Sequence, residues 1–384
     1  MEVLIFFIIV FTIYLLANIF IYKKGIHAIS GYPVLKKYVR IIFWILVLAF
    51  PAGKILEQYY LSQLTDIMIW IGSMWLAALL YFFLISLIIA LLRLIQRFWH
   101  FMPALFFSNR FKLSVFISSV IVAGIILTTG YYNANQITVK HKDIKISSQT
   151  VNNQTLHAVM VSDIHLGTLI DRDHLQKIVK KINALNPDII LMPGDIVDSD
   201  LEPVLKHKSG EAFQELTAKH GIYATTGNHE FIGGVKAATE YLEKNDIRFL
   251  RDTAIFVDES FYLIGREDRE MNRFEDKERK PLSQLTAMVD TSYPVILMDH
   301  QPFHPEEAAN AGIDFQLSGH THNGQLWPIN YITSALFEIS NGYGQVQNMQ
   351  IYVSSGAGTW GPPIRIGSRA EIVSLNIHFS KDNK

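Results

Sequence analysis

The 384-residue sequence contains no cysteine, which excludes disulfide bridges and thiolate metal sites. It also lacks a charge imbalance, because 34 Lys and Arg residues face 35 Asp and Glu residues. No overall charge therefore favours nucleic acid or an acidic partner. Charge is absent locally as well: the residues before 135 contain long runs without ionic side chains, and the positive mean hydropathy of +0.20 originates there. The sequence thus divides into an apolar and a polar half.

Three charge-free runs, at residues 3–22, 67–92 and 113–132, are each long enough to span a bilayer. A fourth run, 41–53, is shorter and contains Pro51. It either lies on the membrane surface or becomes a full span if its helix continues past Lys54. The apolar half, residues 1–132, is therefore expected to be an all-α transmembrane region of about four helices.

The basic residues of the connecting loops distinguish three spans from four. Residues 23–40 and 93–112 carry nearly all of the Lys and Arg in this half, and Lys54 is the single basic residue between the second and third runs. Four spans place both basic loops on one side, as the positive-inside rule requires, whereas three spans place them on opposite sides. We therefore predict a multi-pass protein of the cell membrane with an extracytoplasmic catalytic domain.

Residues 133–154 are polar and are predicted to form a linker, and residues 155–384 a catalytic domain. Within that domain, short apolar runs typical of buried strands alternate with helical spacing. The expected strands are 156–161, 188–192, 221–224, 261–264, 294–298, 315–317, 351–354 and 372–377, and the expected helices are 174–185, 212–220 and 235–245. This alternation predicts a layered α/β domain.

Five short motifs each follow the carboxyl end of an expected strand. They are Asp163-Ile164-His165, Gly194-Asp195-Ile196-Val197-Asp198, Gly227-Asn228-His229-Glu230, the single His300, and Gly319-His320-Thr321-His322. Any one of them alone could be a chance pair, a turn or a surface loop. Together they supply carboxylate, amide and imidazole donors at the edge where α/β sheets gather their sites. This donor set suits two divalent ions such as zinc, manganese or iron.

The donors divide into two sets that share Asp195, because one carboxylate can give an oxygen to each ion. The first ion is expected to take Asp163, His165, Asp195 and His322, and the second to take Asp195, Asn228, His300 and His320. Two such ions would lower the pKa of a bridging water and produce hydroxide near neutral pH. They would also neutralise charge on a phosphoryl group under attack.

One histidine and one aspartate of the motifs remain without a place among the ligands. His229 is predicted to stabilise the transition state or to protonate the leaving oxygen. Asp198 is predicted to orient His229 and to keep it charged. Elsewhere, the charged run 266–280 is either a solvated segment or a flap whose arginines meet a substrate phosphate. Arg365 either grips phosphate or has a plain packing role.

The chain resembles the calcineurin-like metallophosphoesterase superfamily over about residues 155–378. The matching residues are Asp163, His165, Gly194, Asp195, Asp198, Gly227, Asn228, His229, Glu230, His300, Gly319, His320 and His322. The resemblance is greatest to its membrane-anchored bacterial branch. It implies a four-layer α-β-β-α sandwich of two mixed sheets, and hydrolysis of phosphomonoesters, phosphodiesters or pyrophosphates with two ions, commonly manganese, iron or zinc. Ser199-Asp200 stand where protein phosphatases of the superfamily carry Arg-Gly, which disfavours a phosphoprotein substrate.

These observations predict a membrane-bound dinuclear phosphoesterase that acts on a phosphorylated small molecule or lipid, such as a cell-envelope intermediate, with no nucleic acid partner. Three alternatives remain. The domain could lie in the cytoplasm and act on a nucleotide-linked lipid. The chain could be a membrane receptor or scaffold whose phosphoesterase-like domain binds metal without catalysis. The apolar half could be a transport element, which the absence of charge within its clear runs disfavours.

Overall fold

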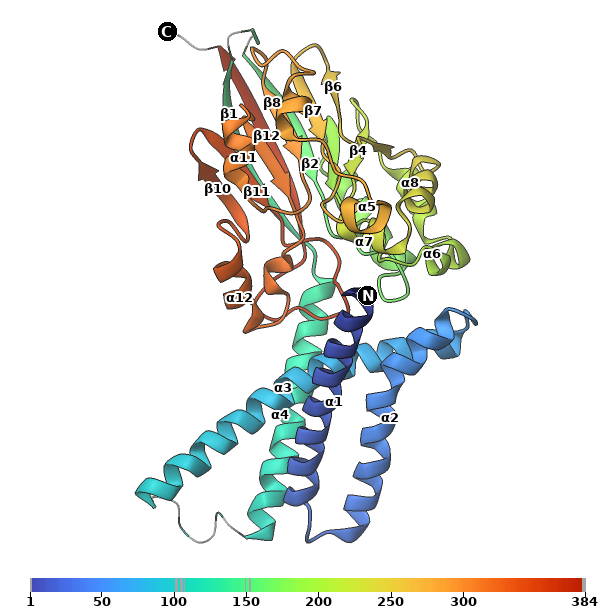
Figure 1. The fold of residues 1–384 in the computed structure, drawn as a ribbon, viewed down its shortest axis with the longest axis vertical. Helices are drawn as coiled ribbons and strands as arrows, with labels where there is room; N and C mark the ends of the chain where they lie inside the picture. The colour runs from blue at the N-terminus through green and yellow to red at the C-terminus, as the bar shows by residue number, and fades with distance from the viewer. Residues whose placement is uncertain are drawn as a thin grey trace. The chain divides into compact units, whose positions relative to one another are not determined.

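The computed structural model describes residues 2–100, 103, 106, 108–148, 150–151 and 153–381. The chain forms two compact units, Met1–Gly130 and Tyr131–Lys384 (Figure 1). Each unit is described separately below.

The first unit is helical. Its helices are α1 (Glu2–Ala28), α2 (Pro33–Glu57), α3 (Gln63–Trp99) and α4 (Asn109–Asn135), of which α4 continues into the second unit. All four are long and apolar enough to cross a membrane, as the sequence predicts. The ambiguous run 41–53 lies inside α2, which passes through Pro51 and ends only at Glu57.

Small and polar residues hold the first unit together. Gly72 of α3 lies so close to the Phe50 backbone of α2 that a side chain there would overlap it. The indole Nε1 of the buried Trp75 donates a 3.0 Å hydrogen bond to Oδ1 of Asn18 in α1. Close backbone approach and a satisfied polar pair are typical of helix packing in an apolar solvent.

The second unit contains two six-stranded mixed sheets. The strands are β1 (Thr138–Ser148), β2 (Gln154–Met160), β3 (Ile189–Pro193), β4 (Ile222–Thr225), β5 (Arg248–Phe249), β6 (Thr253–Val257), β7 (Phe261–Gly265), β8 (Val295–Met298), β9 (Phe315–Ser318), β10 (Gly342–Val346), β11 (Met349–Val353) and β12 (Glu371–Lys381). The first sheet has the order β1-β12-β2-β3-β4-β5 and the second β10-β11-β9-β8-β7-β6. In the first, β2, β3 and β4 are parallel neighbours, and in the second, β8 and β9 are.

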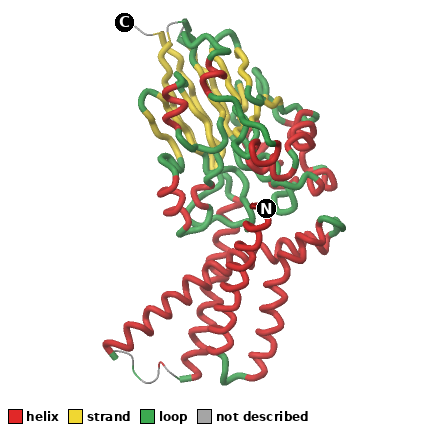
Figure 2. The backbone as a smooth tube through the Cα atoms, in the orientation of Figure 1, coloured by secondary structure: helices red, strands yellow, loops and turns green. Residues whose placement is uncertain are grey.

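The two sheets pack face to face, because successive side chains of each strand alternate between two apolar layers. In β3, Ile189 and Leu191 enter the core shared by both sheets, whereas Ile190 and Met192 face the helical layer outside. In β8, Ile296 enters the shared core and Leu297 faces the opposite helical layer. The domain is therefore a four-layer α-β-β-α sandwich, as expected, and Figure 2 shows its strands in yellow between the helices.

The outer layers and connections contain short helices. They are α5 (Arg172–Asn183), α6 (Glu202–His207), the 3₁₀ helix η2 (Ser209–Glu215), α7 (Asn228–Gly233), α8 (Val235–Glu243), α9 (Met271–Glu275), α10 (Leu282–Thr286), α11 (Pro305–Asn310), the 3₁₀ turn η3 (His322–Gly324) and α12 (Ile329–Leu336). The expected helix 212–220 is thus shorter and begins earlier, because the chain becomes extended at Leu216.

The expected linker 133–154 is wrong in most of its length. Its first residues complete α4, and residues 138–148 form β1, which pairs in parallel with β12 over eleven residues. Ile144 and Ile146 of β1 are buried in the shared core, while Lys145 between them is exposed. The strand lies at the edge of its sheet, and eight of its eleven residues are polar, so the segment looks like a linker in sequence.

Candidate metal centre

The five motifs meet at one end of the sandwich. Asp163, Asp195 and Asn228 come within three residues of the ends of the parallel strands β2, β3 and β4. His300 and His320 come two residues after the parallel strands β8 and β9 of the other sheet. Because parallel strands end at the same edge, the two sheets bring their donors to a common site.

The backbone at this site is held in an unusual conformation. Five of the predicted ligands have positive φ, between 49° and 71°: Asp163, His165, Asp195, His320 and His322. Residues with a Cβ rarely adopt this region, and such conformations cost about 1–3 kcal/mol each. Their concentration here indicates that the fold imposes the geometry for a functional reason.

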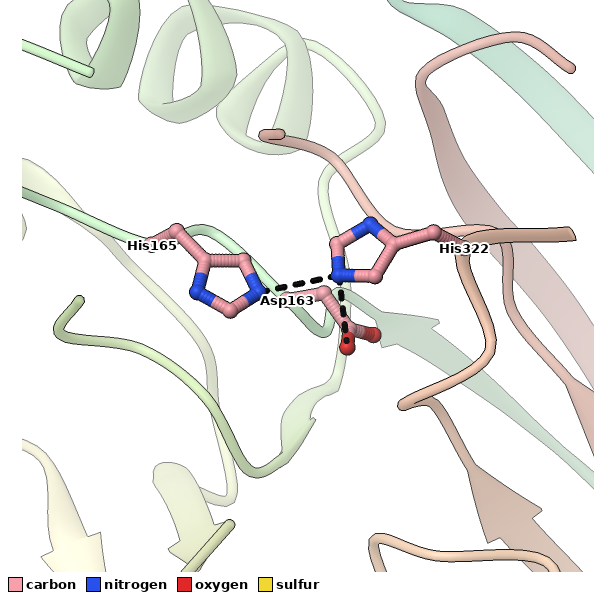
Figure 3. Close-up of side chains that lie close together, drawn as sticks. All are labelled: Asp163, His165 and His322. Carbon is pink, nitrogen blue, oxygen red and sulfur yellow. Dashed lines mark hydrogen bonds and ion pairs between the residues drawn. The ribbon is translucent and has the colours of Figure 1, made fainter. Parts of the chain in front are cut away.

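Figure 3 shows the first group, Asp163, His165 and His322. Nε2 of His165 lies 2.9 Å from Nε2 of His322, which in turn lies 3.6 Å from Oδ1 of Asp163. Ser162 and the amide of His320 each donate a hydrogen bond to the Asp163 carboxylate, at 2.5 and 2.8 Å, and so fix its orientation. All three side chains are buried, and their donor atoms converge on one point.

Asp195 connects this group to the second one, as the sequence predicts for a shared ligand. Its Oδ2 lies 3.8 Å from Nε2 of His165 and 3.0 Å from Nε2 of His300. His320 completes the second group, and its Nδ1 lies 2.9 Å from the amide Oδ1 of Asn228. The amide of His229 donates to Oδ1 of Asp195 at 2.9 Å. Both oxygens of Asp195 are therefore engaged at the centre of the cluster.

A cation would satisfy the donor atoms of the cluster better than their contacts with one another do. Nδ1 of His300 lies 2.8 Å from the carbonyl of Pro193, which can only accept, so Nδ1 carries a proton. Its buried Nε2 makes no hydrogen bond and faces the acidic Asp195. Burial lowers the pKa of His300, but the charge of Asp195 outweighs burial and raises that pKa well above its usual value. A proton thus occupies a position that a divalent ion would fill more favourably.

His229 and Asp198 lie beside the cluster as a pair. Nδ1 of His229 is 3.0 Å from Oδ1 of Asp198 and 2.9 Å from the Ser199 hydroxyl. Burial lowers the pKa of His229, but the charge of Asp195 and the contact with Asp198 outweigh it and raise the pKa to about 9. Burial also raises the pKa of Asp198, while hydrogen bonds from His165 and His229 hold it far below its usual value. At neutral pH the metal-free site therefore presents an imidazolium.

Glu230 holds the two central loops together, a role that its place in the motif did not reveal. Its fully buried carboxylate accepts hydrogen bonds from the amides of Asp195, Ile196 and Val197 at 2.7–3.0 Å, and from the amide of Gly227 at 2.7 Å. Burial raises its pKa despite these four donors. The loop bearing Asp195 and the loop bearing Asn228 are thereby fixed relative to each other.

Arg365 is a buried structural residue and does not grip phosphate. Its guanidinium donates to the carbonyls of Ser355 and Gly358, at 2.6 Å each, and to that of Gly356 at 3.2 Å. It also lies 3.3 Å from Nδ1 of His322. Because the side chain is completely inaccessible, its charge supports the loop behind His322 and meets no ligand.

The charged run 266–280 has two environments: residues 266–268 are buried, whereas residues 272–274 and 276–278 are exposed, as the solvated interpretation expects. Three of its arginines contact other residues of the domain. Nη1 of Arg266 lies 3.2 Å from the carboxylate of Asp299, and Nη1 of Arg279 lies 3.0 Å from it. Arg269 packs over the ring of Phe303. Asp299 directly precedes His300, so the run braces the strand end that carries this ligand.

Trp360 is a site residue that the sequence did not indicate. Its ring lies 6.2 Å from that of His229, edge to face, and it is 59% exposed. It follows the glycine-rich stretch after β11 and belongs to no charged or metal-binding pattern. On the other side of the cluster, the rings of Phe303 and Phe337 lie 6.4 and 6.0 Å from that of His320. Aromatic side chains therefore border the site on two sides.

Two cavities have linings that include neighbours of the cluster, although none of the nine predicted site residues lines either of them. One, of about 430 Å³, is polar and includes Lys140, Asn323 and Arg369 in its lining. The other, of about 350 Å³, is lined partly by Phe303 and Phe337. The structure thus brings all nine predicted site residues to one place. Groups of three side chains there could each hold a metal ion, and these groups contain every His and Asp predicted as a ligand, together with His229.

Comparison with known proteins identifies the family. The sequence profile of the calcineurin-like phosphoesterase family matches residues 156–324. A metallophosphoesterase of Aquifex aeolicus is 31% identical over 218 residues, covering 56% of this chain and 82% of the relative. The chain belongs to the calcineurin-like phosphoesterase family. This metallophosphoesterase is a hydrolase of phosphate esters, as its motifs predict.

Further relatives extend beyond the catalytic domain. A metallophosphoesterase of Campylobacter jejuni is 28% identical over 386 residues, covering 99% of this chain and 100% of the relative. A protein of Danio rerio named transmembrane protein with metallophosphoesterase domain is 30% identical, covering 70% of this metallophosphoesterase and 63% of the relative. Among solved structures, a dimetal phosphatase from Danio rerio is 14% identical, with a TM-score of 0.32, and covers 58% of this chain and 98% of that one.

Proposed function

We propose that this metallophosphoesterase is a membrane-bound, two-metal enzyme that hydrolyses the phosphate ester of a lipid or cell-envelope intermediate. The observation that carries the proposal is the arrangement around Asp195, whose carboxylate lies between two groups of converging donors. In this proposal residues 1–132 anchor the protein and residues 155–384, extended by β1, form the catalytic domain.

Each residue of the cluster has a proposed role. Asp163, His165 and His322 hold one ion; Asn228, His300 and His320 hold the other; and Asp195 is common to both. The ions would be manganese, iron or zinc, because the donors are oxygen and nitrogen without sulfur. When bound, the two ions would supply a water of low pKa and neutralise charge on the phosphoryl oxygens.

His229 acts on the leaving oxygen in this proposal. It is not among the proposed ligands, lies next to Asn228, and carries a proton at neutral pH because Asp195 and Asp198 raise its pKa. It can therefore donate a hydrogen bond, or its proton, to the oxygen that departs with the bond to phosphorus. Asp198 holds Nδ1 of His229, so that Nε2 is the nitrogen available to the substrate.

The proposed location and substrate rest on the first unit. Four helices are long and apolar enough to cross a membrane, and the Danio rerio relative is named a transmembrane protein. Four spans with both basic loops in the cytoplasm leave the catalytic domain outside it. Five residues separate the apolar run 113–132 from β1, which begins at Thr138, so only a short segment joins the proposed membrane span to the catalytic domain. A substrate at the bilayer surface is therefore within reach.

Catalysis is tested with the full chain in detergent micelles, loaded in turn with manganese, zinc and iron. The hydrolysis of bis-p-nitrophenyl phosphate and of p-nitrophenyl phosphate is compared for the parent chain and for Asp195→Asn, with the exposed Asp143→Asn as a matched control. Turnover that Asp195→Asn abolishes and Asp143→Asn retains supports the proposal. A folded chain that binds ions but turns over neither compound would favour the metal-binding receptor.

Location is tested independently of catalysis. A pair of reporters fused after Lys384, one active only outside the cytoplasm and one only inside it, distinguishes the two orientations. Activity of the external reporter alone is expected. Activity of the cytoplasmic reporter alone would reverse the orientation and favour a cytoplasmic substrate.

A further inference from the structure

An exposed apolar surface borders the metal cluster. It consists of five side chains from two loops and from α12, and their exposed fractions are 46% for Trp327, 64% for Tyr331, 58% for Ile332, 67% for Leu336 and 59% for Trp360. We call it the α12 surface. Large apolar side chains that are scattered singly over a surface are ordinary, but a group of this size at one place marks an interaction site.

The sequence around the α12 surface has almost no charge. Between Asp314 and Arg365, the single Asp, Glu, Lys or Arg is Glu338. None of the residues of α12 is buried, so its apolar side chains do not serve the core of the domain. Trp and Tyr combined with aliphatic residues and without charge are the composition that favours the boundary between lipid and water.

The α12 surface is firmly attached to the metal cluster. His322 precedes α12 by seven residues, and Phe337 directly after α12 contacts the ring of His320. Nε2 of the Gln325 side chain donates to the backbone carbonyl of Trp360 at 2.9 Å, and Oε1 of the same side chain accepts from the backbone amide of Trp360 at the same distance. Whatever binds this surface is therefore held at a defined position beside the ligands.

The same surface is also close to the end of α4. The side-chain amide of Asn133 donates to the carbonyl of Arg365 at 3.4 Å, and the amide of Trp327 donates to the carbonyl of Ile366 at 2.7 Å. The surface is thus joined through two neighbouring carbonyls to Asn133, the residue that directly follows the apolar run 113–132. If α4 crosses the membrane, Asn133 lies at the boundary of the bilayer, and the α12 surface must lie near it.

We propose that the α12 surface inserts into the interfacial layer of the bilayer and thereby seats the metal cluster at the membrane surface. The occupant is lipid, because the chain's own helices bring the bilayer to this place and the composition matches its boundary. The inference rests on the membrane placement proposed above but not on the phosphoesterase chemistry. A phosphate group attached to a membrane-embedded chain would then reach the cluster without leaving the bilayer.

The absence of cysteine makes a direct test possible, because one introduced thiol is the only site of labelling. The full chain carrying Ile332→Cys is labelled with a fluorescent probe and reconstituted into phosphatidylcholine–phosphatidylglycerol vesicles that contain a nitroxide lipid. Ile121→Cys, 55% exposed in α4, serves as the membrane control. Phe256→Cys, 41% exposed on β6, serves as the control at the end of the domain away from α12 in Figure 1. Leu336→Cys repeats the measurement at a second position.

The nitroxide lipid is expected to quench the probes at 332 and 336 at least about half as strongly as the probe at 121, and to leave the probe at 256 unquenched. Quenching at 121 without quenching at 332 or 336 would overturn the inference and leave the membrane placement intact. A probe at 121 that escapes quenching would overturn both. Phosphodiesterase activity enters none of these readouts, so a failure of the proposed chemistry would be seen separately.

Discussion

Oδ1 of Asp198 lies 3.0 Å from Nδ1 of His229. Neither residue is a predicted metal ligand, and His229 is the one histidine of the site that is not. The contact keeps His229 protonated and fixes the direction of its other nitrogen. The pair is the part of the site that can move a proton.

We predict that Asp198→Asn lowers kcat about 10²-fold, in the range typical of the loss of general acid–base support. Because the pKa of His229 is raised to about 9 in the absence of ions, its charged form is present below that pH and is lost as the pH rises through it. Asp198→Asn removes part of that increase, so the NMR titration of His229 in the chelator-treated protein should move to lower pH. An unchanged titration would separate Asp198 from the protonation of His229.

A second prediction concerns the number of metal ions bound, which should distinguish a ligand common to both ions from a ligand of one ion only. The parent chain should bind about two ions, since the cluster contains two donor groups. His322→Ala removes a donor of the first group only and should lower the content toward one ion. Asp195→Asn should lower the occupancy of both. Elemental analysis after equilibrium dialysis measures the content, and equal losses in the two variants would contradict the assignment of Asp195 as common ligand.

Arg365→Lys retains the charge but loses the planar fork that reaches the carbonyls of Ser355 and Gly358. Leaving these buried acceptors unsatisfied costs about 1–3 kcal/mol each. We expect a lower midpoint of thermal unfolding and about 10–100-fold weaker metal binding, because the loop behind His322 loses its support. Arg172→Lys, at an exposed arginine of α5, should change neither quantity. Wild-type behaviour of Arg365→Lys would show that the loop is held by other contacts.

Gly319→Ala tests how closely the loops approach the ligands. A Cβ at this position would overlap Oδ2 of Asp163 and would lie 2.7 Å from the Ser162 hydroxyl. The variant should fold with reduced metal affinity, measured by titration with manganese, because the carboxylate must move. Gly124→Ala in α4, where an added Cβ meets nothing within 4 Å, is the control and should bind as the parent does. Equal affinities would mean that the Asp163 loop adjusts freely.

The interior of the fold was predictable from the sequence and its edges were not. The expected strands are the eight inner strands of the two sheets, whose continuous apolar runs reflect burial on both faces. The strands that escaped prediction, β1, β5, β6 and β10, are the four sheet edges of the described chain. An edge strand has solvent on one side and shows a weaker apolar pattern, so its segment looks like a loop or linker.

The site divides in the same way. Its metal-type donors were visible because their chemistry is rare and their order follows the strands. The supporting residues Glu230, Arg365 and Trp360 were not, since their roles depend on which backbone groups the fold brings to them. Bonds between a side chain and a distant main chain leave no pattern along the sequence.

The pairing of β1 with β12 sets the order in which the nascent chain can fold. Residues 138–148 follow the fourth apolar helix, but their partner, residues 371–381, is made only after all the other strands and lies between β1 and β2. The first sheet therefore cannot be completed until almost the whole domain has been synthesised, by which time the helices have entered the membrane. A fragment that begins at residue 150 would lack β1, and the edge of β12 that faces β1 would be left unpaired along eleven residues, although its other edge still pairs with β2. When the domain is produced as a separate fragment, fragments that begin near residue 136 should consequently be secreted in higher yield than fragments that begin at residue 150.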